Sequence, residues 1–431
     1  MGSATATRNS PQWALQASSD KRIERVLNMA KLPLEGIRVC DLTWAVVGPI
    51  ATQMFAVMGA EVIKIESSVH TDINRRSGPY SNGEAGTETT GNFHRANISK
   101  KSCTLDLTQP EAVELAKDLI RISDIVVSNF RNGVMERFGL GNDTLKALKP
   151  DLILVSTTSM GNTGPMKDYV GYNEEAYAYG GLGNLTGYAD GPPSLIAGDY
   201  ADYLSGTLET FAMLAALHCR NGTGKGQSVE VSMAEAAASH VPEEIIDYSM
   251  NQRIRHRSGN RMHGVAPHNC FPCKGEDEWV AIAVTSDAEW IAFRGAIGDP
   301  EWAEDERFGN SQNRSGNQDE LEERIGEWTR NYTPHEVTKI LQGAGVPSGP
   351  SVSIRELVED PHLKERDYFI APEHPEVGER TLEGMPWKSS ISQPDFRHAP
   401  LLGQDNYYVF HDLLNIPDEE IARLMAEGIV N

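Results

Sequence analysis

The sequence contains no hydrophobic run that approaches the roughly 20 residues needed for a membrane-spanning helix. Residues 1–32 lack the apolar core of a signal peptide, so we interpret them as an N-terminal arm. Cysteines are few, five in 431 residues, and their odd number without a secretory signal predicts reduced thiols and a cytoplasmic location. Positive charge is also scarce. The formal net charge of −22 argues against a nucleic-acid or membrane partner, although a local basic pocket could still bind an anionic ligand.

The cysteines lack the spacing of a metal site. Cys270-Phe-Pro-Cys273 is a single CxxC motif, and a zinc site would need a second pair of ligands. A redox site would need a thioredoxin-like βαβ context, which the neighbouring residues do not have. We therefore predict no metal, and we interpret the motif as a turn with two packed thiols.

Strand and helix patterns alternate from residue 34 onward. Residues 37–42 and 62–65 are short apolar runs typical of strands, and residues 50–58 between them have helical periodicity. The alternation continues with a helix over 111–122, a strand over 124–127, a helix over 143–148 and a strand over 152–155. Repeated βα units with continuous apolar strands predict an α/β fold whose parallel sheet is covered on both faces, a Rossmann-like architecture.

We expect a large Rossmann-like domain over residues 33–245 and a smaller α+β domain over 271–372. Residues 246–270, rich in Arg, Asn, His and Gly, would form a linker loop between them, and residues 373–431 would return to the large domain. The first βα turn lacks G-x-G-x-x-G, so a dinucleotide site is not supported.

Asp199 stands where a loop meets a long helical pattern over residues 199–220. An aspartate at this place is commonly an N-cap, whose side chain accepts hydrogen bonds from the first helical turn. The same geometry suits a nucleophile, because backbone N–H groups and the helix dipole keep a carboxylate ionised. Gly198 leaves room for a bulky substrate, and a fixed carboxylate can attack an acyl carbon. The residues alone leave both interpretations open.

Two other segments carry groups suited to an anionic ligand. Lys100 and Lys101 stand just before a short apparent strand that ends at Leu105, and Asn129 and Arg137 follow a later strand. The carboxyl ends of parallel strands are where such folds bind ligands, and Arg and Lys suit phosphate oxygens. The alternative is a solvated surface, which is what most exposed Lys and Arg side chains form.

Over residues 33–412 the chain resembles the family III CoA-transferases, the group of formyl-CoA transferase, carnitine CoA-transferase and α-methylacyl-CoA racemase. The matching stretches follow the family's order and are residues 33–43, 48–49, 59–66, 97–102, 129–130, 198–199, 223–227, 345–350, 360–362 and 399–403. The resemblance implies an interlocked ring-like dimer, either a homodimer or a heterodimer with a paralogous subunit. It also implies that the large domain binds CoA as part of an acyl-CoA substrate, with no permanently bound cofactor.

The resemblance also implies roles for particular residues. The family's nucleophile is the aspartate of a Gly-Asp pair, which corresponds here to Asp199. It attacks the donor thioester to give an acyl-aspartyl anhydride and CoA thiolate, and these form an aspartyl-CoA thioester. The acceptor acid then takes the CoA by the reverse steps. The positions that match the family's CoA contacts are Ala45, Val46, Lys100, Lys101, Leu105, Asn129 and Arg137.

Several departures from the family narrow the function. The racemase branch has a His-Asp pair where this chain has Tyr172-Asn173, so one arm of a two-base proton transfer is missing. Formyl-CoA transferase has a Gln where Val46 stands and an Arg where Ser67 stands. We therefore expect backbone N–H groups to replace some of those contacts.

The expected substrate pocket also differs from that of formyl-CoA transferase. Residues 259–268 replace a run of glycines, and they contain His263 and His268, which are either structural or contacts for a substrate carboxylate. We take Trp44, Tyr172 and His268 as pocket candidates. Trp44 and Val46 predict a more apolar pocket than formate or oxalate needs. We expect an aromatic, branched or dicarboxylic acceptor, such as a benzylsuccinate-like acid, with succinyl-CoA as donor.

Two alternatives fit the same residues. One is an isomerase of the same family, either a racemase, which Tyr172 disfavours, or an intramolecular CoA-transferase acting through Asp199. The other is a scaffolding subunit of a heteromeric CoA-transferase, against which the presence of Asp199 weighs. An active chain that needs no partner would exclude the scaffold.

Overall fold

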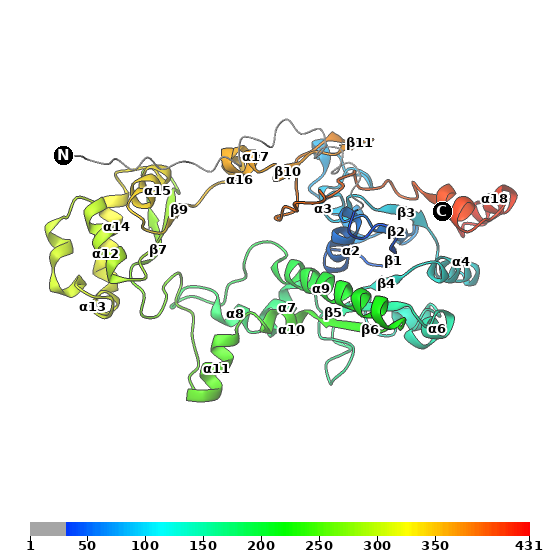
Figure 1. Ribbon diagram of the computed structural model, residues 1–431, viewed down its shortest axis with the longest axis horizontal. Helices are drawn as coiled ribbons and strands as arrows, with labels where there is room; N and C mark the ends of the chain where they lie inside the picture. The colour runs from blue at the N-terminus through cyan, green and yellow to red at the C-terminus, as the bar shows by residue number, and fades with distance from the viewer. Residues whose placement is uncertain (1–31) are drawn as a thin grey trace, which may run out of the picture. The chain divides into compact units, whose positions relative to one another are not determined.

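The computed structural model describes residues 32–431, which fall into two compact units (Figure 1). The sheet unit contains residues 32–168, 205–231 and 368–431, and the second unit contains 169–204 and 232–367. The expected N-terminal arm therefore lies almost entirely outside the described residues. Residues 368–431 group with the sheet unit. Residues 169–204 and 232–245, which we expected in the large domain, group with the second unit.

The sheet unit is built on a six-stranded sheet with the order β3-β2-β1-β4-β5-β6. Its strands are β1 (Arg38–Asp41), β2 (Glu61–Glu66), β3 (Lys101–Thr104), β4 (Ile125–Ser128), β5 (Ile153–Thr158) and β6 (Ser228–Ser232). The pairs β2–β3, β1–β2, β1–β4 and β4–β5 are all parallel. This order reverses direction between β1 and β4, as in doubly wound α/β proteins, and the predicted Rossmann-like architecture is confirmed.

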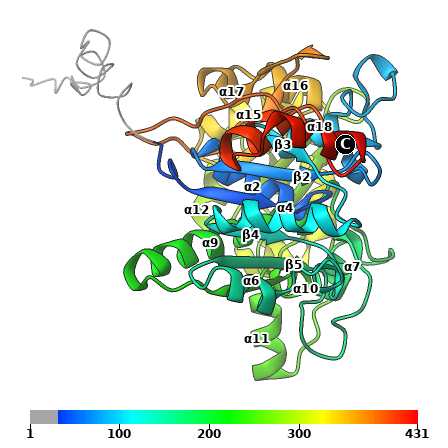
Figure 2. The same cartoon turned by 90° about the vertical axis from the view of Figure 1, so that its right-hand side faces the viewer.

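Helices cover both faces of this sheet because each strand buries alternate side chains on opposite faces. On one face, Val39 and its counterparts on other strands pack against α2 (Val47–Val57) and α9 (Tyr200–Thr223). On the other face, Cys40 and its counterparts pack against α4 (Pro110–Arg121), α6 (Asn142–Leu148) and α18 (Asp418–Ala426). Figure 2 looks onto the side that carries α4 and α18.

The second unit has its own core around a three-stranded antiparallel sheet of β7 (His268–Pro272), β8 (Trp279–Ala283) and β9 (Ser348–Pro350). Trp290 and Phe293 of α12 (Asp287–Ala296) are buried there, with side chains of α14 (Gln318–Thr329) and α15 (Pro334–Gly343). The expected small α+β fold is therefore present.

The CxxC motif is not a simple turn. Cys270 lies within β7 and pairs with Ala281, while Cys273 is buried just beyond the end of the strand. Burial raises the pKa of both thiols, that of Cys273 to about 11. Both cysteines are free thiols in the structure.

The remaining elements are short. The helices are α3 (Gly91–Asn97), α5 (Val134–Arg137), α7 (Asn173–Tyr179), α8 (Leu182–Leu185), α10 (Met233–Ala238), α11 (Pro242–Asn251), α13 (Ser311–Gly316), α16 (Ile354–Glu359) and α17 (Pro361–Glu365). The C-terminal segment adds the strand pairs β10 (Phe369–Ile370) with β13 (Leu382–Glu383) and β11 (Glu373–His374) with β12 (Gly378–Glu379), and a π-helix, η6 (Tyr408–Leu413). The 3₁₀ turns are η2 (Ile73–Arg75), η3 (Ser81–Gly83), η4 (Glu301–Glu304) and η5 (Glu306–Phe308). Because α11 begins with a proline in its first turn, the expected linker loop is helical up to Asn251.

Within residues 32–431, no helix is both long enough and apolar enough to cross a membrane.

Candidate active site

A pocket of about 310 Å³ lies beyond the carboxyl ends of β1, β2, β3 and β4. This is the point at which the strand order reverses, where open α/β sheets bind their ligands. Its walls are mostly apolar, and the lining residues are Leu42, Trp44, Ile65, Glu66, Ser67, His70, Leu105, Asp106, Leu107, Thr108, Phe130, Val134 and Phe138. Two residues singled out in the sequence, Trp44 and Leu105, thus line the same pocket, and Ser67 lines it too.

Asn129 holds the backbone of Trp44 in place. Its Oδ1 accepts a hydrogen bond from Trp44 N at 2.8 Å, and its Nδ2 donates to Trp44 O at 2.7 Å. The Trp44 ring then meets the Phe130 ring edge to face, with centroids 5.5 Å apart. The side chain of Asn129 therefore joins the ends of β1 and β4 and fixes one wall of the pocket.

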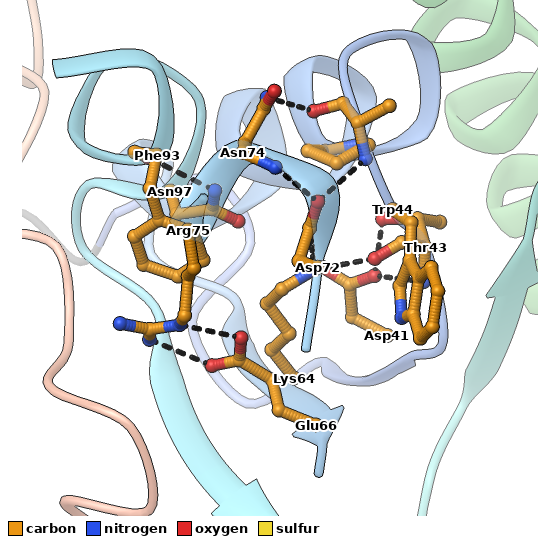
Figure 3. A network of polar contacts seen from close by, with 12 residues as sticks. Asp41, Thr43, Trp44, Lys64, Glu66, Asp72, Asn74, Arg75, Phe93 and Asn97 are labelled. Atoms are coloured by element: carbon orange, nitrogen blue, oxygen red, sulfur yellow. Dashed lines mark hydrogen bonds and ion pairs between the residues drawn. The ribbon is translucent and has the colours of Figure 1, made fainter. Parts of the chain in front are cut away.

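The backbone at Ala45 adopts an uncommon conformation with φ of 62°, which costs about 1–2 kcal/mol for a residue with a Cβ. Two hydrogen bonds hold it there. Ala45 N donates to Asp72 Oδ1 at 3.0 Å, and Asn74 Nδ2 donates to Ala45 O at 2.6 Å (Figure 3). Val46, the next residue, is buried and immediately precedes α2.

Lys100 does not face solvent as its sequence context suggested. Its ammonium group is buried and donates to Asp41 Oδ2 at 3.0 Å, Pro49 O at 3.0 Å and Asn97 Oδ1 at 2.9 Å. These three bonds use all three N–H donors of the ammonium, so none is left for a phosphate. Burial, with the charge of nearby Lys64, lowers the pKa of Lys100 to about 8, although Asp41 opposes this. The geometry thus corrects our interpretation and gives Lys100 a structural part.

Lys101 and Arg137 are the more accessible cations of the two basic segments. Lys101 Nζ lies 3.9 Å from Asp405 Oδ1 and 4.3 Å from the centroid of the Tyr408 ring, and its side chain is 26% exposed. Arg137 is exposed on α5, the helix whose Val134 lines the pocket.

A buried charge network stands behind the pocket, and our sequence reasoning missed it (Figure 3). Lys64 Nζ lies 3.2 Å from Asp72 Oδ2, and both side chains are fully buried. Burial favours a neutral Lys64, but Asp72 and Asp41 outweigh it and raise the pKa of Lys64. The sequence did hold one signal of this network, because Lys64 is a charged residue inside an apolar strand pattern.

Arg75 and Glu66 form the second half of the network. Arg75 Nε and Nη2 donate to the two carboxylate oxygens of Glu66, each at 2.8 Å, and Nη1 donates to Glu88 at 2.8 Å. Burial would raise the pKa of Glu66, but the Arg75 charge outweighs it and lowers that pKa. The Arg75 guanidinium also lies 3.6 Å from the centroid of the Phe93 ring. This bidentate pair anchors η2 and its N-cap, the turn whose Asp72 and Asn74 hydrogen-bond to the main chain of Ala45.

In the second unit, Asp199 is the residue immediately before α9. Gly198 adopts a positive φ of 78°, and Asp199 O accepts the helical bond from Tyr203 N at 3.0 Å. The N–H of Ala201 donates to Asn173 Oδ1 at 2.8 Å. The side chain of Asn173 therefore accepts hydrogen bonds from the first turn of the helix that follows Asp199.

Tyr172 and His268, the other two pocket candidates, also belong to the second unit. Tyr172 is 67% exposed, and its main-chain N donates to Glu175 Oε2 at 2.8 Å. His268 Nδ1 lies 2.6 Å from Asn260 O, and the residue lines an open pocket of about 360 Å³ beside β7 and β8. Trp44, in contrast, belongs to the sheet unit.

The described part of the chain holds no group of three or more His, Cys, Asp or Glu side chains arranged to bind a metal ion.

The fold and the pocket define a Rossmann-like α/β enzyme with its ligand crevice between β1 and β4. A family model described as CoA-transferase family III matches residues 34–406, and the chain belongs to this family of enzymes.

Named relatives agree with this assignment along nearly the whole chain. The chain is 34% identical to the succinyl-CoA–D-citramalate CoA-transferase of Chloroflexus aurantiacus, covering 92% of this chain and 98% of the relative. It is 30% identical to the beta subunit of a succinyl-CoA–L-malate CoA-transferase of the same organism, with 93% and 98% covered. It is 32% identical to the formyl-CoA:oxalate CoA-transferase of Streptomyces coelicolor, with 93% and 100% covered.

Solved structures agree as well. The crystal structure of a CaiB/BaiF family protein from Brucella suis matches with a TM-score of 0.81 at 29% identity. The match covers 89% of this chain and 100% of that protein.

Proposed function

We propose that this chain moves CoA from an acyl-CoA thioester, succinyl-CoA, to a dicarboxylic acid, with Asp199 as the nucleophile. The observation that carries the proposal is the position of Asp199. In a family III chain it directly follows a positive-φ glycine and directly precedes a long helix. Gly198 supports the approach of a substrate, because a Cβ built on it would meet no atom within 4 Å.

The reaction divides into balanced steps. A carboxylate oxygen of Asp199 attacks the thioester carbonyl and displaces CoA thiolate, which leaves a mixed anhydride of the donor acid and Asp199. The thiolate then attacks the aspartyl carbonyl of that anhydride and releases the donor carboxylate, so that Asp199 carries CoA as a thioester. The acceptor carboxylate repeats these two steps in reverse and leaves with CoA. No proton needs to be transferred and no electron changes hands.

The pocket beyond β1 and β4 is the proposed site for the nucleotide part of CoA. Its apolar walls, which include Leu105, Phe130 and the Trp44 ring, suit the faces of an adenine ring. Arg137, exposed on α5 beside Val134 of the pocket wall, is the proposed source of positive charge for the phosphates. Lys101 opens β3 at the opposite end of the strand from the pocket, beside Asp405 and Tyr408, so we do not assign it to this site. The main-chain groups of Ala45 are already bonded to Asp72 and Asn74, so we assign that residue to the shape of the wall.

The acceptor is the least constrained part of the proposal. The names of the relatives support succinyl-CoA as donor and a dicarboxylic acid such as citramalate as acceptor, and another relative acts on oxalate. We propose an acid larger than oxalate, in line with the names of the two succinyl-CoA relatives. An aromatic dicarboxylate of the benzylsuccinate kind is a further candidate of this size. Tyr172 and His268 are proposed pocket residues for the acceptor.

Tyr172 disfavours the racemase alternative. A phenol stands where the racemase branch has the imidazole that works as one of two bases, so one arm of a two-base proton transfer is missing. An intramolecular transfer would use Asp199 in the same way. Because one relative is a beta subunit, we propose assembly either as an interlocked homodimer or with a paralogous subunit.

The test is a transfer assay with the purified chain alone. Succinyl-CoA is mixed in turn with citramalate, malate, benzylsuccinate, oxalate and formate, and the new thioester is measured by mass spectrometry. We expect transfer to one of the three larger dicarboxylates. Oxalate or formate as the best acceptor would contradict the proposed class of acceptor. Transfer only after a paralogous subunit is added would identify a heteromeric enzyme.

A further inference from the structure

The loop that leads to Asp199 projects into solvent. Residues 192–198 are all exposed, including Leu195 at 49% and Ile196 at 42%. Glycines with positive φ stand near both ends, with φ of 128° at Gly187 and 78° at Gly198. A loop of this kind has few contacts of its own to hold it. A nucleophile at its end must nevertheless be placed within a fraction of an ångström. Residues 187–199, which we call the nucleophile loop, therefore need contacts that fix their two ends.

The first end of the nucleophile loop is held by Arg257. Its Nη2 and Nε donate to Gly191 O at 3.1 and 3.3 Å, and its Nη1 donates to Asn184 O at 3.2 Å. The planar guanidinium thus ties the loop to the C-terminal end of α8. A backbone bond from Gly259 N to Gly187 O at 2.9 Å joins the same two segments. A Cβ built on Gly187 would come 3.0 Å from Arg257 Cδ, so the packing at this point is tight.

The second end is held by Asn173, the first residue of α7. Its side chain is buried, with only 6% of the residue exposed. Its Oδ1 accepts from Ala201 N at 2.8 Å and, at the limit of a hydrogen bond, from Asp202 N at 3.4 Å. These are the N–H groups of the first turn of α9, immediately after Asp199. An amide does this without charge, so the cap adds no second anion beside the nucleophile.

Tyr177, one turn further along α7, connects the two ends. Its hydroxyl lies 2.8 Å from Thr186 Oγ1, just before the nucleophile loop begins. Its ring meets the ring of Tyr200 edge to face, just after the loop ends, with centroids 6.1 Å apart. Tyr177 of α7 therefore contacts one residue just before the nucleophile loop, Thr186, and one just after it, Tyr200.

We propose that Asn173 and Arg257 are positioning residues that fix the two ends of the nucleophile loop and so place the Asp199 carboxylate for attack on the thioester. This inference rests on the proposed function of Asp199. It predicts that loss of either contact lowers the rate of the first covalent step and leaves the affinity for acyl-CoA nearly unchanged. A displacement of about 1 Å at a reacting group can cost about 10²-fold in rate.

The test uses single-turnover capture in the full chain. Each protein is mixed with succinyl-CoA and hydroxylamine, and the rate at which Asp199 becomes a hydroxamate is followed by peptide mass. The dissociation constant for succinyl-CoA is measured separately. We expect Arg257→Met and Asn173→Ala to be captured about 10- to 100-fold more slowly than the wild type, with less than a threefold change in that constant.

Conservative variants and a matched control complete the design. Asn173→Asp keeps an oxygen acceptor for Ala201 N, so it should be captured faster than Asn173→Ala, and Arg257→Lys should be faster than Arg257→Met. Arg255→Met is the control, because Arg255 lies in the same segment, is exposed and pairs with Glu244 at 2.7 Å instead of with the loop. It should be captured at the wild-type rate.

The outcomes separate this inference from the function on which it rests. If the wild type binds succinyl-CoA but is never captured at Asp199, the proposed nucleophile is wrong. If the wild type is captured and the Arg257 and Asn173 variants react equally fast, the nucleophile stands and the positioning role is overturned. If Arg257→Met or Asn173→Ala fails to fold, Arg257→Lys and Asn173→Asp test the positioning role instead. These two variants should then be captured more slowly than the wild type with an unchanged circular dichroism spectrum, and wild-type rates in both would refute the role.

Discussion

Replacing Glu209 by glutamine tests whether a carboxyl group buried behind the sheet is neutral in the folded enzyme. Glu209 lies on α9 in the sheet unit and is fully buried. Neither carboxylate oxygen makes a hydrogen bond of regular geometry with any described residue. Burial, with the negative charge of Asp41, raises the pKa of Glu209 to about 8 from an ordinary 4.5, although the Thr157 hydroxyl and Lys100 oppose this.

The sign of the effect follows from proton binding. Between pH 4.5 and 8 the folded chain keeps the proton on Glu209 while the unfolded chain has lost it. The contribution of this group to the free energy of unfolding is therefore fully present below pH 4.5 and falls as the pH rises, by up to about 1.4 kcal/mol per unit. From pH 5.5 to 7.5 the wild type should lose about 2.5 kcal/mol through this one group. Glu209→Gln, which cannot ionise, should lose none of it.

The assay is urea unfolding of the wild type and Glu209→Gln at pH 5.5 and 7.5, with the difference between the two proteins taken at each pH. That difference should move by about 2.5 kcal/mol in favour of the variant at the higher pH. Glu84→Gln, an exposed glutamate of the same unit, is the control and should show no such change. A difference between wild type and Glu209→Gln that is the same at both pH values would refute the assignment of a neutral, buried acid.

Three further single substitutions separate ligand binding from folding among the basic residues of the sheet unit. Arg137→Ala should weaken binding of acyl-CoA by about 1–3 kcal/mol, measured by calorimetry, and an unchanged affinity would exclude a phosphate contact. Lys100→Ala removes the ion-pair partner of the buried Asp41 carboxylate, so the free energy of unfolding should fall by about 3–5 kcal/mol. A fall under 1 kcal/mol would contradict the structural role of Lys100. Arg75→Met should lower the free energy of unfolding by a similar amount in urea, because Glu66 stays buried without its bidentate partner. The double variant Arg75→Met with Glu66→Gln should recover part of that free energy, and no recovery would contradict the pairing of Arg75 with Glu66.

Much of the sheet could be predicted from the sequence, because its strands are continuous apolar runs that only a doubly covered parallel sheet buries. The strands expected at 37–42, 62–65, 124–127 and 152–155 all formed, each within three residues of its expected ends. The start of α9 immediately after Asp199 was equally readable, since a glycine and an aspartate precede an unbroken helical period. These signals are local, and each lies within a few residues of the feature that it predicts.

Features that depend on distant partners could not be read in this way. The sequence around Lys100 resembles a solvated basic patch, and its burial follows from Asp41, a residue 59 positions earlier. Asn173 was noticed as a departure from the racemase pattern, but its role as a cap for α9 depends on a contact 28 residues further along the chain. Ala45 has a positive φ at a position without glycine, because Asp72 and Asn74 fix its backbone from another segment.

The division of the chain into two units also depends on contacts between residues far apart in sequence. Residues 169–204 stand in sequence between two segments of the sheet unit, and only their packing assigns α7 (Asn173–Tyr179) and α8 (Leu182–Leu185) to the second unit. The same unit contains the loop around Arg257, whose arginines looked like an irregular basic surface. Their acceptors are carbonyl groups and acids that no periodicity marks, so the sequence did not identify them.

Covalent capture at Asp199 tests the central claim most directly. The purified wild type is incubated with succinyl-CoA and hydroxylamine, and the mass of the peptide that carries Asp199 is compared with that of Asp199→Asn treated in the same way. The account predicts a hydroxamate on the wild-type peptide at Asp199 and none on the variant, while both proteins bind the acyl-CoA. A wild-type peptide of unchanged mass, from protein that demonstrably binds succinyl-CoA and transfers its CoA to a dicarboxylate, would contradict it.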